Sequence, residues 1–314
     1  VWVAFACQRA GIGLRLPLPQ LTPKVRELLR LILPAALGAG VVQINLVIDV
    51  ILASLLPKGS VSFLFYADRL NQLPIGVIGV AVGTAILPLL SRLLAQNDQA
   101  GAIAALNRAI ELTLFLALPA MVAFLVLADE LILTLFQRGQ FSPSDSRATA
   151  FALTAYTIGL PAYVLVKVLG PAFFARRDTR TPVMVGIVAV VVNVVLNLIL
   201  MQYLLHAGLA LATAIAAWLN VGLLSWILHK RGNFIADRQL LKRLARSIGA
   251  SLLMGLLLWC LKKWLGALFT AGEANRFFGL VIMVAVGLTS YGLAALLLRA
   301  IEWREIKGLL ARRQ

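Results

Sequence analysis

The chain has 314 residues, of which 61% are hydrophobic and only 13% are charged, and its mean hydropathy is +0.92. Soluble domains carry about 25% charged residues, so this composition excludes an ordinary soluble protein and indicates an integral membrane protein. The net charge of +16 does not predict a nucleic-acid partner, because the Lys and Arg residues are scattered over many short loops instead of forming one basic stripe.

Apolar stretches of about 20 residues, long enough to cross a bilayer as a helix, follow one another along the chain. We predict an all-α membrane protein with about eight transmembrane helices, at 31–55, 62–92, 110–136, 148–174, 182–205, 207–229, 244–265 and 277–300. The segment 1–30 starts with an apolar stretch too short to span and continues with basic residues. It is predicted to be the end of a preceding, truncated helix followed by a cytoplasmic basic linker.

Lys and Arg residues are concentrated in alternate connections between the predicted helices. The rich segments are 1–30, 92–108, 176–180, 230–246 and the tail from Arg299. Basic residues accumulate on the cytoplasmic side of membrane proteins. The pattern therefore predicts a multi-pass protein of the cytoplasmic membrane with both ends of the chain, including the C-terminus, in the cytoplasm.

Two adjacent charges, Asp68 and Arg69, lie inside the second predicted span. A charge at the bilayer centre costs about 2.5–3.5 kcal/mol on insertion scales, so such residues usually face a cavity or the protein interior. Arg69 offers a planar fork of donors suited to phosphate oxygens, and we interpret it as a contact for an anionic substrate. The alternative is an ion pair with Asp68, but neighbours on a helix do not face each other. Lys167 could contact the anion or neutralise an acidic residue.

A second polar set consists of oxygen-bearing side chains in three other spans: Asp49, Asn193, Asn197 and Thr213. Asn193 and Asn197 are four residues apart and share one helix face. Carboxylate, amide and hydroxyl oxygens are hard donors for a small cation, which makes a sodium site one hypothesis. The alternative is that Asp49 pairs with Arg69 or Lys167 while the asparagines pack between helices.

The second span also contains helix-breaking residues: Pro74, Gly76, Gly79 and Gly83. Proline removes a backbone hydrogen bond and glycine lowers the cost of bending, so we predict a hinge here. The glycines could instead allow close helix packing, and both interpretations can hold together.

The sequence contains no catalytic motif. Gly-x-Ser-x-Gly, phosphate-loop and His-Glu-x-x-His patterns are absent, and Cys7 and Cys260 have no spacing that predicts a metal site. We therefore expect no enzymatic activity and no cofactor, apart from coupling to Na⁺ or protons.

Two stretches resemble a known family. The run from Phe65 to Val77, followed by Gly83 to Pro88, is similar to the hallmark of the MurJ/MviN lipid II flippases in the MOP exporter superfamily. The run from Leu165 to Pro182, with Asn193 to Asn197 and His206 to Thr213, resembles the tenth to twelfth helices of that family.

The resemblance implies that 31–230 is the C-terminal six-helix lobe of a bacterial inner-membrane transporter, and that 231–314 adds two helices and a basic cytoplasmic tail. It also implies a missing N-terminal lobe, membrane lipids and lipid II as partners, a monomeric protein, and alternating access. Arg69, with Asp68 and Lys167, would contact the substrate, and Asp49, Asn193, Asn197 and Thr213 match the family's proposed sodium site. The sequence leaves open another MOP exporter, either a polysaccharide-lipid flippase or a multidrug antiporter; a membrane enzyme would need clustered acidic or histidine residues.

Overall fold

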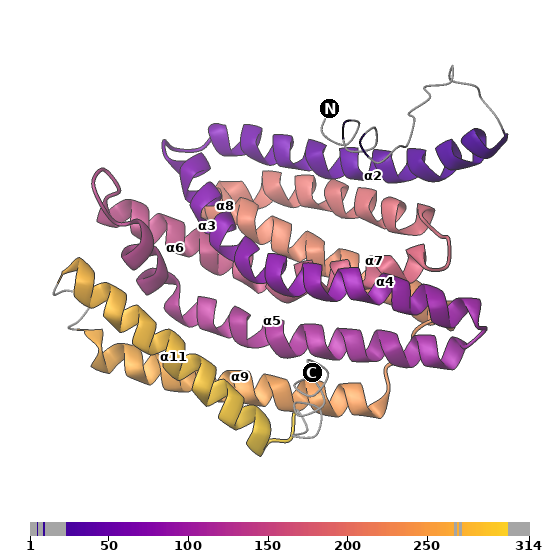
Figure 1. Cartoon of the computed structure of the whole chain (residues 1–314). Helices are drawn as coiled ribbons and strands as arrows, with labels where there is room; N and C mark the ends of the chain where they lie inside the picture. The colour runs from indigo at the N-terminus through magenta and orange to yellow at the C-terminus, as the bar shows by residue number, and fades with distance from the viewer. Residues whose placement is uncertain (1–4, 6–8, 10–22, 267–268, 270–271, 301–314) are drawn as a thin grey trace.

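The computed structural model describes residues 5, 9, 23–266, 269 and 272–300, and the helices of this part of the chain lie side by side in a bundle (Figure 1). Most of the predicted N-terminal stub and of the basic tail falls outside these residues. In chain order the elements are α2 (Pro23–Ser54), α3 (Ser60–Pro74), the π-helix η1 (Ile75–Gly79), α4 (Val80–Ala95), α5 (Gln99–Phe136), α6 (Pro143–Ile158), α7 (Leu160–Phe174), α8 (Arg180–Lys230), α9 (Arg238–Trp264) and α11 (Glu273–Leu297).

Six helical segments within the described residues are long and apolar enough to cross a membrane: Ser60–Ala95, Gln99–Phe136, Pro143–Phe174, Arg180–Lys230, Arg238–Trp264 and Glu273–Leu297. The longest, α8, reverses direction at the non-helical residue Leu205, so it accounts for two spans (Figure 1), and the described stretch Gln43–Ser54 within α2 is a shorter apolar helix. The predicted all-α fold with about eight spans is confirmed. Several boundaries differ: α2 begins at Pro23, inside the range predicted as linker, and α5 begins at Gln99, before the predicted start at residue 110.

Side chains at the loop ends determine where several helices start. Asp98 accepts a hydrogen bond from the backbone of Gly101 at the start of α5, and Asp237 accepts one from Leu240 at the start of α9. Ser142 and Asp145 form a reciprocal capping box at the start of α6. Each cap satisfies backbone N–H groups that have no partner within the helix.

The helices alternate in direction, so their connections gather at the two ends of the bundle. The connections 96–98, 175–179 and 231–237 lie at one end, and 55–59 and 137–142 lie at the other (Figure 1). The first group is the one that the sequence marks as rich in Lys and Arg.

Two spans contain breaks of regular helix, one that was not predicted and one within the segment predicted as a hinge. The span predicted as 148–174 is divided at Gly159 into α6 and α7. A methyl group at Gly159 would lie 2.8 Å from Ala214 Cα, which indicates that α8 approaches the chain closely here. The second break is η1, where five residues adopt a π-helix directly after Pro74.

Helix α5 packs both against the helices that precede α9 and against the last two helices, α9 and α11. It contributes buried side chains to three apolar clusters: with α4, α7 and α8, with α3, α6 and α8, and with α9 and α11. Because α9 packs mainly on α5, and α11 packs on α9 and to a lesser extent on α5, α5 joins the last two helices to the rest of the bundle.

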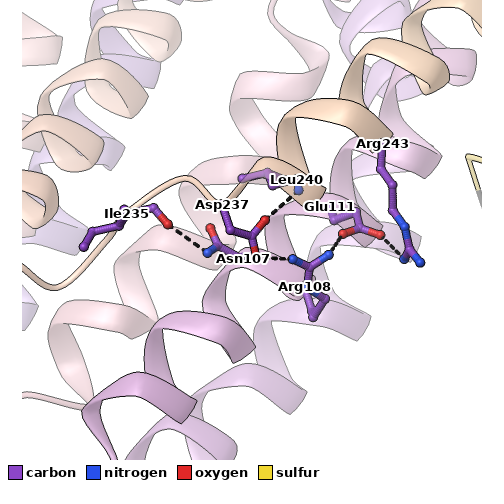
Figure 2. A network of polar contacts seen from close by, with 7 residues as sticks. All are labelled: Asn107, Arg108, Glu111, Ile235, Asp237, Leu240 and Arg243. Carbon is purple, nitrogen blue, oxygen red and sulfur yellow. Dashed lines mark hydrogen bonds and ion pairs between the residues drawn. The ribbon is translucent and has the colours of Figure 1, made fainter.

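A polar network fixes α9 to α5 at the end of the bundle that carries the 231–237 connection. Figure 2 shows Arg108 of α5 between two carboxylates, Asp237 and Glu111, and Arg243 of α9 on the other side of Glu111. Asn107 adds a hydrogen bond of 2.9 Å to the Ile235 carbonyl. The side chains of Arg243 and Glu111 are only 8% and 13% exposed, so this contact is largely shielded from solvent.

Candidate functional site

The predicted pair Asp68 and Arg69 lies on α3, and both side chains contact Gln72. The Gln72 amide donates to the Asp68 carboxylate, and Arg69 donates to Gln72 Oε1 at 3.5 Å. The Arg69 guanidinium also lies 4.7 Å from the centroid of the Phe65 ring. Within the described part of the chain the two charges form no ion pair with each other, although both side chains contact the same amide.

The two members of the pair face different surroundings. Asp68 is half-buried and lines a cavity within the bundle, whereas Arg69 is exposed on the face of α3 that carries Phe65 and Gln72. A guanidinium held by one long hydrogen bond and a ring contact keeps most of its donors available. Arg69 can therefore bind an anion that approaches this face.

The four residues of the predicted cation site come together. Asn197 donates to Asp49 Oδ1 at 2.6 Å and to Asn193 Oδ1 at 3.0 Å, and Asn193 contacts Thr213 Oγ1 at 3.3 Å. Asp49 comes from α2, the asparagines from the first arm of α8 and Thr213 from the second. Asn45, one turn before Asp49, donates to the other carboxylate oxygen at 3.1 Å. No contact of Asp49 with Arg69 or Lys167 occurs among the described residues.

This cluster contains an oxygen atom whose bonding capacity is unused. Asn193 and Asn197 are buried, and Asn197 Oδ1 has no hydrogen-bond partner in the described part of the structure. A buried polar atom without a partner costs about 1–3 kcal/mol, and a small cation would supply the missing interaction. The donor set, one carboxylate with amide and hydroxyl oxygens, fits Na⁺.

A cavity of about 430 Å³ joins the two predicted sets of residues. Its lining includes Asp68 and Lys167 from the first set and Asn193 and Thr213 from the second. Arg69 does not line this cavity, so the structure separates it from the two residues that were grouped with it.

Three residues that line the cavity with unpartnered polar atoms were not predicted as site residues. Asn71 Oδ1, Tyr163 Oη and Asn220 Oδ1 line it and have no hydrogen-bond partner in the described structure. Asn71 is only 1% exposed. The sequence offered one signal, because Asn71 and Asn220, like the predicted residues, are polar side chains inside apolar spans. Only the packing of α3, α7 and α8 brings these atoms to one cavity.

The predicted hinge residues fall into two groups. Gly76 and Gly79 lie within η1, directly after Pro74, and nothing lies within 4 Å of a methyl group placed at Gly76. At Gly79 such a methyl would lie 3.3 Å from Lys167 Cγ, and at Gly83 it would lie 2.9 Å from the Lys167 carbonyl oxygen. Gly79 and Gly83 thus also permit close packing on α7, as the alternative interpretation states.

A family model described as lipid II flippase MurJ matches residues 2–278 of the chain. The chain belongs to the lipid II flippase MurJ family. Two relatives named probable lipid II flippase MurJ support this: that of Rhizobium meliloti is 45% identical over 84% of this chain, and that of Vibrio cholerae is 38% identical over 96%.

Solved structures agree with this assignment. A lipid II flippase MurJ in an inward closed conformation matches with a TM-score of 0.72 and 29% identity over 94% of this chain. An outward-facing multidrug resistance MATE family transporter of the MOP superfamily matches with a TM-score of 0.58 at 20% identity over 85% of the chain. The second likeness shows a shared fold alone.

The chain spans about half of the family's length. It covers 49% of the Rhizobium meliloti protein, 57% of the Vibrio cholerae protein and 59% of the solved MurJ chain. The described helices are therefore those of one part of the family's fold, a multi-pass membrane unit.

Proposed function

We propose that this chain is the C-terminal part of a lipid II flippase, which moves an undecaprenyl-diphosphate-linked peptidoglycan precursor from the cytoplasmic to the outer leaflet of the bacterial inner membrane. The single observation that carries the proposal, beside family membership, is the exposed guanidinium of Arg69 inside a membrane-spanning segment. A cation kept at this depth without an acidic partner within the described residues needs an anionic ligand to offset its desolvation.

In this proposal Arg69 holds the diphosphate together with residues of the N-terminal lobe of the same protein. The lobes rock and expose the headgroup to alternate sides, and no covalent step is needed. The polar headgroup cannot cross hydrocarbon unaided, so the protein provides a polar route. Asp68 and Lys167 contribute charge beside this route, and we take the functional unit to be a monomer with both ends of this chain in the cytoplasm.

The substrate assignment is tested by lipid II binding to the full-length protein. Native mass spectrometry would compare wild type with Arg69→Ala and with Arg138→Ala, an exposed arginine just after α5 whose guanidinium donates to the Leu135 carbonyl. Loss of a charge-assisted contact predicts at least about tenfold weaker binding for Arg69→Ala and no change for Arg138→Ala. Equal binding by all three proteins, or equal binding of an unrelated polyprenyl diphosphate sugar, would refute the assignment.

We further propose that Asp49, Asn193, Asn197 and Thr213 hold a sodium ion that couples to the cycle. The unpartnered oxygen of Asn197 and the contact across the two arms of α8 support this, because a bound cation would draw α2 and both arms of α8 together. Sodium binding would supply positive charge to a carboxylate that lies in a low-dielectric environment.

The sodium proposal predicts that NaCl raises the unfolding temperature of the full-length protein more than KCl does at equal ionic strength. Asp49→Asn should abolish the difference, whereas Asp98→Asn, which changes a helix cap at the surface, should retain it. If NaCl and KCl raised the unfolding temperature of the wild type equally, the sodium proposal would be refuted and coupling to protons would be the alternative.

The hinge proposal places bending at η1. A single π-turn within an α-helix is rare and frequently occurs at functional sites, and Pro74 removes one backbone donor directly before it. Gly76→Ala, at a position with free space, should slow flipping without reducing lipid II affinity. A variant with unchanged flipping would assign these residues to packing alone.

The orientation of the chain is tested by single cysteines placed in connections at opposite ends of the bundle. Asn97→Cys should be protected from a membrane-impermeant maleimide in intact spheroplasts, and Gly139→Cys should react. The reverse labelling pattern would place the ends of the chain outside the cytoplasm.

A further inference from the structure

A second pocket lies apart from the cavity described above, at the end of the bundle that carries the 175–179 and 231–237 connections. It has a volume of about 550 Å³ and is formed by the first turns and the last turns of α8. Its lining includes Arg180, Met184, Val185, Trp226, Ile227 and Lys230. The two arms of one helical hairpin thus enclose a space that has charged residues at its rim and apolar residues along its wall.

The charge balance of this pocket is strongly positive. Asp178, in the 175–179 connection next to the pocket, already accepts from Arg231 at 2.6 Å and from the backbone and hydroxyl of Thr181 at 2.9 and 2.6 Å. Burial tends to raise the pKa of Asp178, but these bonds from Thr181 and Arg231 hold it below its usual value. The Asp178 carboxylate is therefore ionised and fully engaged, and Arg231 is neutralised by it.

Two cations remain at the rim. Within the described part of the structure neither Arg180 nor Lys230 forms an ion pair. The Lys230 ammonium lies 5.3 Å from the centroid of the Trp226 ring, which places a cation beside an aromatic surface instead of beside an acid. Two positive charges converging on one pocket attract an anion.

The wall of the pocket indicates where the anion comes from. Met184 and Trp226 are 51% and 59% exposed although they belong to a membrane-spanning helix, so lipid is their natural environment. Tryptophan is enriched where the acyl chains meet the headgroups. The pocket thus combines an interfacial aromatic, an apolar wall and two cations, the combination expected for the phosphate and the first acyl carbons of a phospholipid.

We propose that this pocket binds the phosphodiester of an anionic glycerophospholipid from the membrane leaflet at that end of the bundle. Arg180 and Lys230 contact the phosphate oxygens, and the apolar wall of Met184 and Trp226 contacts the glycerol end of the acyl chains. The proposal does not depend on lipid II being the transported substrate, because no residue of this pocket belongs to the site assigned to it.

The test is native mass spectrometry of the full-length protein titrated with phosphatidylglycerol, with phosphatidylcholine of the same acyl chains, and with inorganic phosphate. Two variants form a matched pair. Lys230→Gln removes the cation over Trp226, and Lys263→Gln removes the cation that lies 3.6 Å from the Trp259 ring centroid near the end of α9, a residue that does not line the pocket.

For phosphatidylglycerol, Lys230→Gln should weaken binding about fivefold and the double variant with Arg180→Gln about 25-fold, as expected for one cation each near a headgroup. Lys263→Gln should leave the affinity unchanged, and phosphatidylcholine should bind weakly to all variants. Equal losses for Lys230→Gln and Lys263→Gln would overturn the proposal, because they would indicate a diffuse charge effect.

A further variant, which changes no charge, tests the pocket if the charge variants fail to fold. Met184→Trp fills the wall of the pocket while retaining every charge, and it should reduce phosphatidylglycerol binding by at least fivefold. Unchanged binding by this variant would refute the pocket. Binding of inorganic phosphate that competes with the lipid and depends on Arg180 and Lys230 would show that the site takes free phosphate, and would overturn the lipid assignment.

Discussion

The close approach of the two arms of α8 at Gly208 gives a test of the packing at the proposed cation site. Gly208 follows the reversal at Leu205 by three residues and faces the backbone of the first arm. A methyl group there would lie 2.5 Å from the Leu200 carbonyl carbon and 3.0 Å from the Met201 nitrogen. Because both atoms belong to the backbone, no side-chain rotation can relieve the overlap, and the arms must separate.

Gly208→Ala should therefore lower the free energy of unfolding by about 1–3 kcal/mol, the usual cost of overpacking a close-packed interior. The same displacement would lengthen the contact between Asn193 and Thr213, which is 3.3 Å and bridges the two arms. We expect the variant to lose sodium-dependent stabilisation together with part of its stability.

Gly222→Ala is the matched control, since it lies on the same helix with nothing within 4 Å of the added methyl. Alanine in a helix interior is favoured over glycine by about 0.5–1 kcal/mol, so this variant should be unchanged or slightly more stable. The measurement is the unfolding free energy of the full-length protein in mixed micelles titrated with a denaturing detergent. If Gly208→Ala matched or exceeded the stability of Gly222→Ala, the close approach of the arms would be wrong.

Three further predictions concern the polar contacts outside the cavity. Glu111→Gln should destabilise the protein by about 2 kcal/mol, because Glu111 accepts charge-assisted bonds from Arg108 and Arg243; thermal unfolding that matches wild type would contradict this. Asp237→Ala removes the cap of α9 and should cost about 1 kcal/mol, visible as faster amide exchange at the start of that helix. The folded-state pKa of Asp178 is lowered, so its contribution to stability is present at neutral pH and is lost as pH falls through that lowered pKa. The stability difference between wild type and Asp178→Asn should therefore be constant above about pH 5 and shrink in acid, and a difference that persists unchanged to pH 2 would refute the assignment.

The spans could be predicted because membrane insertion depends on local hydropathy, which is a property of each segment. The reversal at Leu205, where φ is 51°, coincides with the predicted boundary between 182–205 and 207–229. The association of Asn193 with Asn197 was also predictable, because residues four apart share a helix face whatever the tertiary structure.

Contacts between helices could not be read from the sequence in the same way. The separation of Asp68 from Arg69 depends on which face of α3 packs on α6, and the polar cavity around Asn71 and Tyr163 depends on three helices meeting. The close approach of Ala214 on α8 to the break at Gly159 is another such contact. These features follow from packing between elements that are distant in sequence. Polar residues within apolar spans indicate that such contacts exist, but not which helices form them.

The π-helix at Ile75–Gly79 changes how residues are counted along the second span. A π-turn accommodates one more residue than an α-turn, so η1 amounts to a single extra residue placed between α3 and α4. Removing Val77, whose side chain is 75% exposed, would restore a regular helix and keep the buried faces of α3 and α4 in the same relative orientation. A homologous chain that is one residue shorter at this point would therefore retain the packed core of the bundle while lacking its irregular turn.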